Sequence, residues 1–301
     1  MDKLLFLNFC LLDAALYATV KYFSKLSHHS TMEIISYGNV AAVLCLLPFA
    51  LYRWQATKKG FIPNLRLFLA APSSALKTVA VGGLSIKNVA VISYLQPAVI
   101  VMLSFMMLGE YDKKNLKQYA WLGISFVGIL IFVGFVDIRG NAMMYGLVFL
   151  HVLFKGLVNI FTKQLSDDRH TTMFYAKLHY AIFNVIIFCV MGITPSLDMF
   201  FSKATLIITA ILIATQYSLI WAYKYAEKIS LLQNIDYSRI FFTCLLAYLL
   251  FGESMESRQI FGLIIIVTSI ILSHSGDLEM RKYSIVVLDS VKDKYKKYKN
   301  K

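Results

Sequence analysis

The chain has 301 residues, of which 58% are hydrophobic, and a mean hydropathy of +0.64. This composition excludes an ordinary soluble domain and is typical of a protein embedded in a membrane. The formal net charge of +13 would suit a nucleic-acid partner, but the placement of the charges along the chain argues against one.

Ten apolar stretches are each long enough to cross a bilayer, which takes roughly 20 residues. They cover residues 3–24, 31–52, 64–85, 88–108, 117–135, 142–163, 171–193, 203–225, 228–251 and 258–275. Unpaired backbone groups are not tolerated in lipid, so we expect an all-α polytopic membrane protein with ten transmembrane helices. The first stretch carries Asp13 and Lys21 and lacks a small-residue cleavage site, so we interpret it as a span and not as a cleavable signal peptide.

One hydrophobic unit occurs twice, at residues 95–134 and 235–276. Each copy reads as an apolar helix ending in Gly-Glu (Gly109–Glu110, Gly252–Glu253), a polar turn, and a second apolar helix with an early glycine. We expect those early glycines, Gly123 and Gly262, to allow close helix approach. Five spans per half is an odd number, so the second half must enter the membrane in the opposite orientation. The sequence thus predicts two inverted five-helix repeats, residues 1–135 and 136–276, and a basic tail at 277–301.

The basic residues lie mostly on one side of the predicted membrane. With the N-terminus inside, 20 of them fall in cytoplasmic loops and the tail, and five fall on the opposite face: Lys25, Lys87, Arg139, Lys203 and Arg258. This asymmetry predicts a multi-pass protein of the cell inner membrane with both termini cytoplasmic. It explains the net charge without nucleic acid, and the basic tail is suited to contact with anionic membrane lipids.

Charged residues inside the predicted spans are the candidates for function. Burying one costs ~2.5–3.5 kcal/mol even on lenient insertion scales. Lys21 and Lys177 lie near span ends, where their side chains could instead reach the interface. Lys77, Lys155 and Arg239 lie near mid-span, and we expect them to line a solute pathway, with a structural ion pair as the alternative.

Helical spacing groups the candidates further. Asp13, Tyr17 and Lys21 share one face of the first span, and His151, Lys155 and Asn159 share one face of the sixth, the two spans that open the two halves. Asp236 and Arg239 are three residues apart and could simply pair with each other. His151 is a candidate proton relay or, alternatively, a hydrogen-bonded helix contact, and Gln96, beside Pro97, is a candidate cavity residue. The predicted substrate-binding residues are Asp13, Tyr17, Lys21, Lys77, Gln96, His151, Lys155, Asp236 and Arg239.

No catalytic chemistry is indicated. There is no phosphate-binding Gly-rich loop, no zinc-protease motif and no serine nucleophile elbow, so we predict no enzyme activity, catalytic residue, metal site or cofactor. The four cysteines fall inside separate spans and read as apolar packing residues: Cys10, Cys45, Cys189 and Cys244.

The stretch at 222–253, followed by an apolar helix that opens IFG, resembles the end of an EamA domain of the drug/metabolite transporter superfamily. Residues 88–110 resemble the corresponding part of the other half, and the resemblance covers most of residues 4–275. It implies a 5+5 inverted-repeat fold, a central cavity and alternating access driven by gradients or exchange. Such proteins often carry an arginine in the second span, which here reads ISYGNV at 35–40, so Lys77 or Lys155 would have to take over any role of that arginine.

The resemblance implies a secondary transporter of a small metabolite. Cations outnumber acids within the spans, which would suit a charged substrate, anionic or zwitterionic, with a carboxylate or phosphate group. Lysine outnumbers arginine 23 to 7 and isoleucine is frequent, which suggests the AT-rich genome of an intracellular bacterium. That favours metabolite uptake, with S-adenosylmethionine or an amino-acid-like compound as the leading substrate. The alternatives are an exporter of amino acids or drugs within the same superfamily, or a non-transporting membrane scaffold or enzyme. Whether the protein forms a homodimer is left open.

Overall fold

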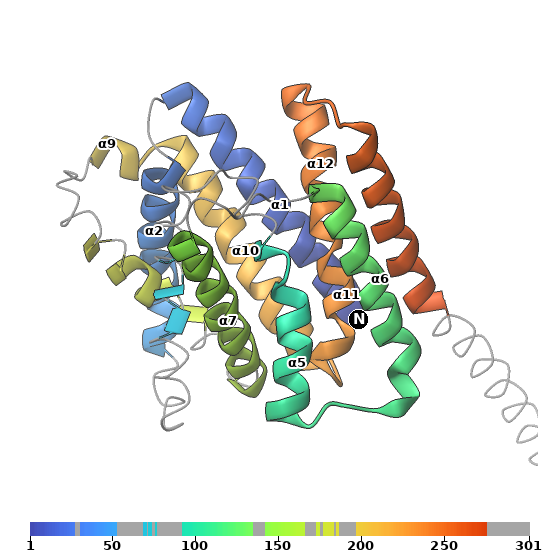
Figure 1. The fold of residues 1–301 in the computed structure, drawn as a ribbon. Coiled ribbons are helices and arrows are strands. Elements are labelled where there is room, and N and C mark those ends of the chain that lie inside the picture. Colours follow the sequence, from blue (N-terminus) through green and yellow to red (C-terminus); the bar gives the residue numbers. More distant parts are fainter. Residues whose placement is uncertain are drawn as a thin grey trace, which may run out of the picture.

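The computed structural model describes residues 1–27, 31–52, 69–70, 72–73, 76, 92–134, 142–165, 173–174, 177–183, 185–186 and 197–275. Among these residues all regular structure is helical (Figure 1). The helices are α1 (Asp2–Ser27), α2 (Thr31–Tyr52), α5 (Gln96–Leu108), η2 (Lys113–Asn115), α6 (Leu116–Val133), α7 (Ala142–Leu165), α9 (Leu197–Phe200), α10 (Lys203–Tyr225), η3 (Ile229–Leu231), α11 (Gln233–Asp236), α12 (Ser238–Phe251) and a last helix at Ser257–Ser275. The prediction of an all-α protein is confirmed for the described part of the chain.

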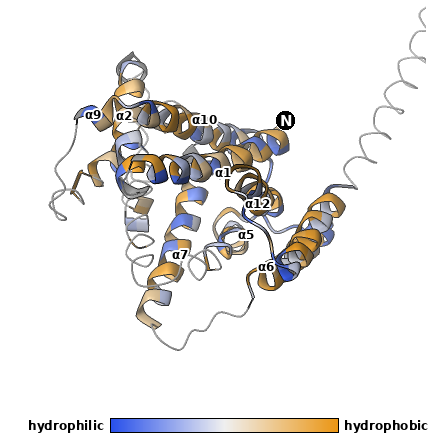
Figure 2. Cartoon of the chain, turned by 90° about the horizontal axis from the view of Figure 1, so that it is seen from above, coloured by the Kyte–Doolittle hydropathy of each residue, from blue (hydrophilic) through white to orange (hydrophobic). Residues whose placement is uncertain are grey.

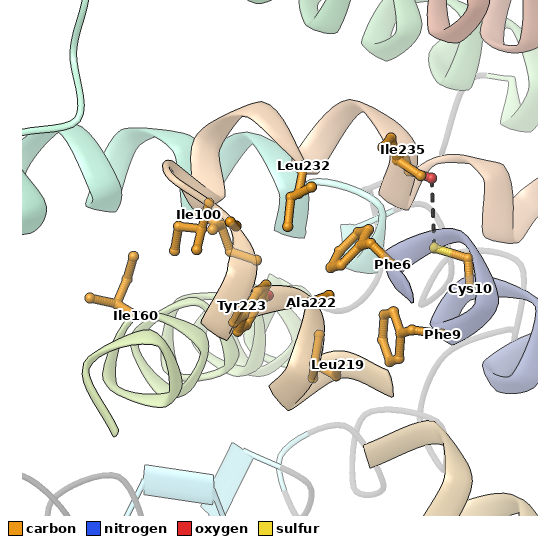
Figure 3. Packing of buried hydrophobic residues seen from close by; sticks show 12 residues of the cluster. Phe6, Phe9, Cys10, Ile100, Ile160, Leu219, Ala222, Tyr223, Leu232 and Ile235 are labelled. Carbon is orange, nitrogen blue, oxygen red and sulfur yellow. Dashed lines mark hydrogen bonds between the residues drawn. The ribbon is translucent and has the colours of Figure 1, made fainter. Parts of the chain in front are cut away.

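Helix α1 lies at the centre of the bundle, between α10 and α12 (Figure 1). It runs antiparallel to α10, because Asn8 donates a 2.9 Å hydrogen bond to Ser218 and the Phe6 ring stacks on Tyr223 at 5.9 Å. We call the end of the bundle where α1 begins the N-terminal end, and the other the opposite end. The largest buried apolar cluster lies at the N-terminal end, where α1, α5, α7 and α10 meet (Figure 3).

Two helical hairpins, α5–α6 and α12 with the last helix, carry the duplicated sequence. The first helix of each ends at a glycine in the left-handed conformation, Gly109 (φ 63°) and Gly252 (φ 66°), where other residues are strained. The turn of the first hairpin lies at the N-terminal end and that of the second at the opposite end (Figure 1). The two hairpins therefore point in opposite directions along the bundle, while the ten-helix inverted repeat stays a prediction.

The second helices of the two hairpins, α6 and the last helix, cross with their backbones in near contact. A Cβ built on Gly262 would lie 2.6 Å from the Phe132 nitrogen and 2.7 Å from the Gly128 carbonyl oxygen. The close approach expected at Gly262 is thus confirmed. The expectation for Gly123 is wrong for the described part of the chain, since a Cβ there would have no neighbour within 4 Å among the described residues. The glycine of α6 that contacts Gly262 is Gly128, which lies about one and a half turns beyond Gly123.

Beside this crossing, α6, α11 and the last helix share a buried network of hydrogen bonds. The Ser125 hydroxyl bonds both to Ser269 and to the side-chain oxygen of Asn234 (2.6 Å), and the Asn234 amide donates to Ser273 (2.7 Å). In an apolar environment such a network is stable only when its members find partners, and it fixes α11 against both crossing helices.

Five described helices are long and apolar enough to cross a membrane. They are Asp2–Leu26, Lys113–Val133, Ala142–Gln164, Lys203–Tyr225 and Ser257–Ser275. Hydrophobic residues cover much of the described helices (Figure 2), and large apolar side chains stand exposed on them, among them Leu206, Leu249 and Ile271. Apolar exposure on this scale marks a surface that faces lipid or another apolar partner. Much of the predicted spans 64–85 and 171–193 lies outside the described residues, and the division into repeats at 1–135 and 136–276 stays a prediction.

The predicted span at 228–251 is not one uninterrupted helix. It begins with η3, continues as α11, and passes through Tyr237 into α12. Several of its amides bond three residues back and not four, as between Ile235 and Leu232 and between Ile240 and Tyr237. The tighter 3-10 winding accounts for the interruptions without a proline.

Candidate functional site

Three charged side chains meet where the broken ninth span packs against α1. The Arg239 guanidinium donates to the Asp236 carboxylate at 2.6 Å and to the Asp13 carboxylate at 3.2 Å, and its Nε donates to the Asp236 carbonyl at 3.4 Å. We call Asp13, Asp236 and Arg239 the charged cluster. The Asp236 side chain is 3% exposed, and those of Asp13 and Arg239 are 18% and 19% exposed. The local pair of Asp236 and Arg239, one of the predicted alternatives, is thus part of a larger arrangement.

The local fold of α1 and α11 positions the cluster. Asp13 lies about 16 Å along α1 from its first turn, near the middle of the helix. Asp236 ends α11 and Arg239 lies in the first turn of α12, so the break at Tyr237 separates the two partners. Beneath them the buried Cys10 thiol donates to the Ile235 carbonyl at 3.6 Å (Figure 3), and Cys10 also lies 3.9 Å from the Asp236 carboxylate.

The duplication places a second break at the equivalent point of the fourth span. Gln96 lies thirteen residues before Gly109, and Arg239 lies thirteen residues before Gly252. In both copies the preceding residues form a turn that contains a tyrosine, Tyr94 in the first copy and Tyr237 in the second. Tyr94 is within electrostatic range of Arg239, Asp13 and Tyr17. Gln96 itself is buried at the start of α5.

Two lysines on other elements lie within electrostatic range of the cluster: Lys155 of Asp236, and Lys177 of Asp13. Lys155 of α7 is partly buried and lies within electrostatic range of Asp236 and of Lys177. Among the described residues it has no hydrogen bond and no ion pair. The Lys177 side chain is 2% exposed and donates to the Asn39 side-chain oxygen of α2 at 3.3 Å. The interfacial alternative considered for Lys177 is therefore wrong, because its ammonium group lies inside the bundle.

Of the remaining predicted site residues, Tyr17 lies one turn beyond Asp13 on α1, 47% exposed and within electrostatic range of Arg239. His151 is buried, and its Nδ1 lies 2.7 Å from the Ser73 carbonyl and 2.9 Å from the Ser73 hydroxyl. These contacts agree with the hydrogen-bonded helix contact, and the proton relay stays a prediction. Lys77 lies outside the described residues.

Lys21 is not part of the charged cluster. It lies two turns beyond Asp13, at the opposite end of the bundle, where it pairs with Glu253 and stands 4.7 Å from the Phe251 ring centroid. Its side chain is 44% exposed. The structure thus separates Lys21 from Asp13 and Tyr17, the residues that share its helix face.

Sequence reasoning did not select Cys10, Asn39, Tyr94 and Lys177 for the site. The duplication held a signal for Tyr94, because it aligns with Tyr237 next to the predicted ion pair. Nothing in the sequence connects Asn39 with Lys177, since their contact depends on how α2 packs in the bundle.

In the part of the chain that the structure describes, fold and site together define an all-helical protein of the membrane-embedded class, with a partly buried charged cluster among helices that are long and apolar enough to cross a bilayer. No protein-family model matches the chain, and no curated protein matches it. Twenty-seven chains of solved structures do. One, described as "Crystal structure of protein", is 12% identical, covers 90% of this chain and 96% of its own, and gives a TM-score of 0.74. This chain shares the fold of that structure.

Proposed function

We propose that this chain is a secondary transporter that moves a small charged metabolite, anionic or zwitterionic, across the membrane by alternating access. The proposed architecture is ten spans in two inverted five-helix repeats, as the EamA resemblance implies. The observation that carries the proposal is Lys155, a partly buried lysine within electrostatic range of Asp236 that has no hydrogen bond and no ion pair among the described residues. The charged cluster that contains Asp236 lies at a break in a span. Broken helices near the bilayer midplane form the substrate sites of many secondary transporters.

The electrostatics of the site favour a substrate with an anionic group. Lys155 is partly buried in an apolar bundle without a counter-ion in hydrogen-bonding contact among the described residues. An isolated charge in such a place is costly, and a substrate carboxylate or phosphate would offset that cost by a charge-assisted hydrogen bond. The charged cluster holds two carboxylates and one guanidinium, so a substrate ammonium group would find a complementary partner there.

The placement of chain ends and lysines at the two ends of the bundle supports the proposed orientation. In that orientation the protein lies in the cell inner membrane with both termini in the cytoplasm. Residue 1 and the end of the last helix lie at the same end (Figure 1). That end also carries many of the lysines predicted to be cytoplasmic, among them Lys113, Lys163 and Lys228. The opposite end carries Lys25, Lys203 and Arg258, three of the five cations predicted to be external.

The test is flux into proteoliposomes that hold the purified chain. S-adenosylmethionine, amino acids and nucleotides are offered first, and we expect saturable uptake that one class of compound competes away. Lys155→Ala should lower the flux at least about tenfold, because one charge-assisted hydrogen bond contributes about 1.5–3 kcal/mol. Lys155→Arg should retain more flux, and Lys203→Ala, an exposed lysine at the start of α10, should leave it unchanged. Full flux in Lys155→Ala, or no saturable flux with any mixture, would refute the proposal.

A further inference from the structure

The Gly-Glu end of the first hairpin makes a buried contact with the second half of the chain. The Glu110 side chain is 7% exposed, and its two carboxylate oxygens accept the backbone amides of Ile229 (3.0 Å) and Ser230 (2.9 Å). These amides open η3, and the N–H groups in the first turn of a helix have no intrahelical partners. Glu110 therefore ties the turn between α5 and α6 to the start of the ninth span.

Two further contacts hold the same connection between α10 and η3. Lys228 forms a 2.9 Å ion pair with Asp112, two residues after Glu110. Lys163, at the end of α7, donates to the carbonyl of Tyr223 at 2.8 Å and also to that of Ala226, at the end of α10. At the N-terminal end of the bundle, the connection is thus fixed on one side by the α5–α6 turn and on the other by α7. We call the contact of Glu110 with Ile229 and Ser230 the Glu110 latch.

The Gly-Glu end of the second hairpin has a different partner. Glu253 is 49% exposed and pairs with Lys21 of α1. Lys21 and Lys25 both stand over the Phe251 ring, at 4.7 and 5.0 Å from its centroid. From Asp236 to Glu253 the ninth span rises about 25 Å at 1.5 Å per residue. The two copies of one motif therefore act at opposite ends of the bundle, one buried on backbone amides and one half-exposed on a lysine.

The stretch between the latch and the charged cluster contains buried polar atoms with unmet hydrogen bonds. Within the described part of the chain, the Ser230 hydroxyl and the Gln233 side-chain oxygen have no partner, although both atoms are buried. Each such atom costs about 1–3 kcal/mol while it stays dry. Ser230, Gln233 and Asp236 follow one another at intervals of three residues, close to one face of the tightly wound η3–α11 segment.

We propose that the Glu110 latch is a gate: it holds the N-terminal end of the bundle closed, and its release lets water reach the charged cluster along the η3–α11 segment. Water entering there would satisfy Ser230 and Gln233, which lowers the free energy of the open state relative to the closed one. The inference rests on the proposed alternating access for its purpose, but it concerns a conformational change that can be measured without flux.

Cys10 reports on this change, because its thiol is fully buried in the structure and lies 3.9 Å from Asp236. A variant that retains Cys10 as its single cysteine, with Cys45, Cys189 and Cys244 replaced by alanine, is reconstituted in vesicles and labelled with a membrane-impermeant maleimide from either side. Glu110→Gln removes the charge, and Glu110→Asp withdraws the carboxylate by one methylene. Both should raise the labelling rate about tenfold or more from the side that holds the N-terminus, the shift expected for losing one charge-assisted hydrogen bond.

Glu227→Gln is the matched control, because Glu227 is an exposed carboxylate on the same connection. An unchanged rate in both Glu110 variants, an equal rise from both sides, or the same rise in Glu227→Gln would each overturn the latch. If neither Glu110 variant yields monodisperse protein, the labelling rate of Asp112→Asn tests the latch instead. Asp112 is more exposed than Glu110 and only supports the Glu110 latch through its ion pair with Lys228. A one-sided rise of about twofold or more is then expected, and a wild-type rate rejects the inference. One-sided opening in a protein that carries no flux would refute the proposed transport and leave the latch standing.

Discussion

Replacing Gly262 by alanine should destabilise the protein through one backbone contact. The added Cβ would lie 2.6 Å from the Phe132 nitrogen and 2.7 Å from the Gly128 carbonyl oxygen, whereas ordinary contacts begin at 3.4 Å. Both obstructing atoms belong to the backbone of α6, so no side-chain rotation relieves the overlap. The two helices must instead separate by on the order of 0.8 Å, the difference between the ordinary contact distance of 3.4 Å and the 2.6 Å at Phe132. Such a separation disturbs the close packing of the two helices.

The cost of this separation follows from overpacking. Forcing an extra methyl group into a packed interface costs about 1–3 kcal/mol. The separation also stretches the bond from Ser125 to Ser269, which bridges the same pair of helices. At about 2–4 °C per kcal/mol for a chain of this size, the apparent unfolding temperature should fall by about 2–12 °C.

Gly123 of α6 is the matched control, because a Cβ there meets nothing within 4 Å among the described residues. Gly123→Ala should be neutral or stabilising by about 0.5–1 kcal/mol, since alanine restricts the unfolded chain more than glycine does. Both variants are heated in one detergent at one scan rate, with unfolding followed by fluorescence, because membrane-protein unfolding is commonly irreversible. Equal unfolding temperatures for Gly262→Ala and Gly123→Ala would refute this account of the helix crossing.

Two further predictions concern charged side chains. Arg239→Met leaves two carboxylates without their cation and should lower the free energy of unfolding by about 3–5 kcal/mol. The double variant Arg239→Met/Asp236→Asn should recover part of this loss, which a double-mutant unfolding cycle would measure. If the effects of the two single substitutions simply add in the double variant, the two side chains do not form a direct pair. At the membrane surface, the amide of Lys114 and the ammonium of Lys228 hold the pKa of Asp112 below its usual value, and Asp112 raises the pKa of Lys228. The difference in free energy of unfolding between wild type and Asp112→Asn should therefore be constant from about pH 5 to 9. It should shrink as the pH falls through the lowered pKa of Asp112, and also as the pH rises through the raised pKa of Lys228. A difference that is largest in acid would contradict the ion pair.

The part of the fold that the sequence predicts well depends on local patterns. Apolar length predicts helices such as α1 and α10, because a chain in lipid must satisfy its own backbone. The Gly-Glu motif predicts where α5 and α12 end, since a left-handed residue suits glycine. The pair of Asp236 and Arg239 follows from their spacing of three residues alone.

What the sequence does not predict depends on packing between distant elements. The aligned glycines Gly123 and Gly262 suggest a symmetric crossing, but the contact is made by Gly128, because the register of two helices is set by all the side chains between them. The break at Tyr237 carries no proline. Its counterpart in the first copy stands just before Pro97, so only one of the two breaks has a visible cause in the sequence.

Equivalent positions in the two copies carry different chemistry, and in the proposed alternating-access cycle this would limit how the two halves could exchange roles. Arg239 aligns with Gln96, so only the second copy brings a permanent charge to its break. In the proposed cycle, each half would in turn take the conformation of the other. The Arg239 guanidinium would nevertheless stay on the ninth span throughout, beside Asp13 of α1. The Gly-Glu carboxylates differ in the same way, since Glu110 binds backbone amides that every sequence has, whereas Glu253 depends on a single lysine side chain. The contact at the N-terminal end should therefore resist substitution of its partner residues, and the contact at the opposite end should be lost with Lys21 alone.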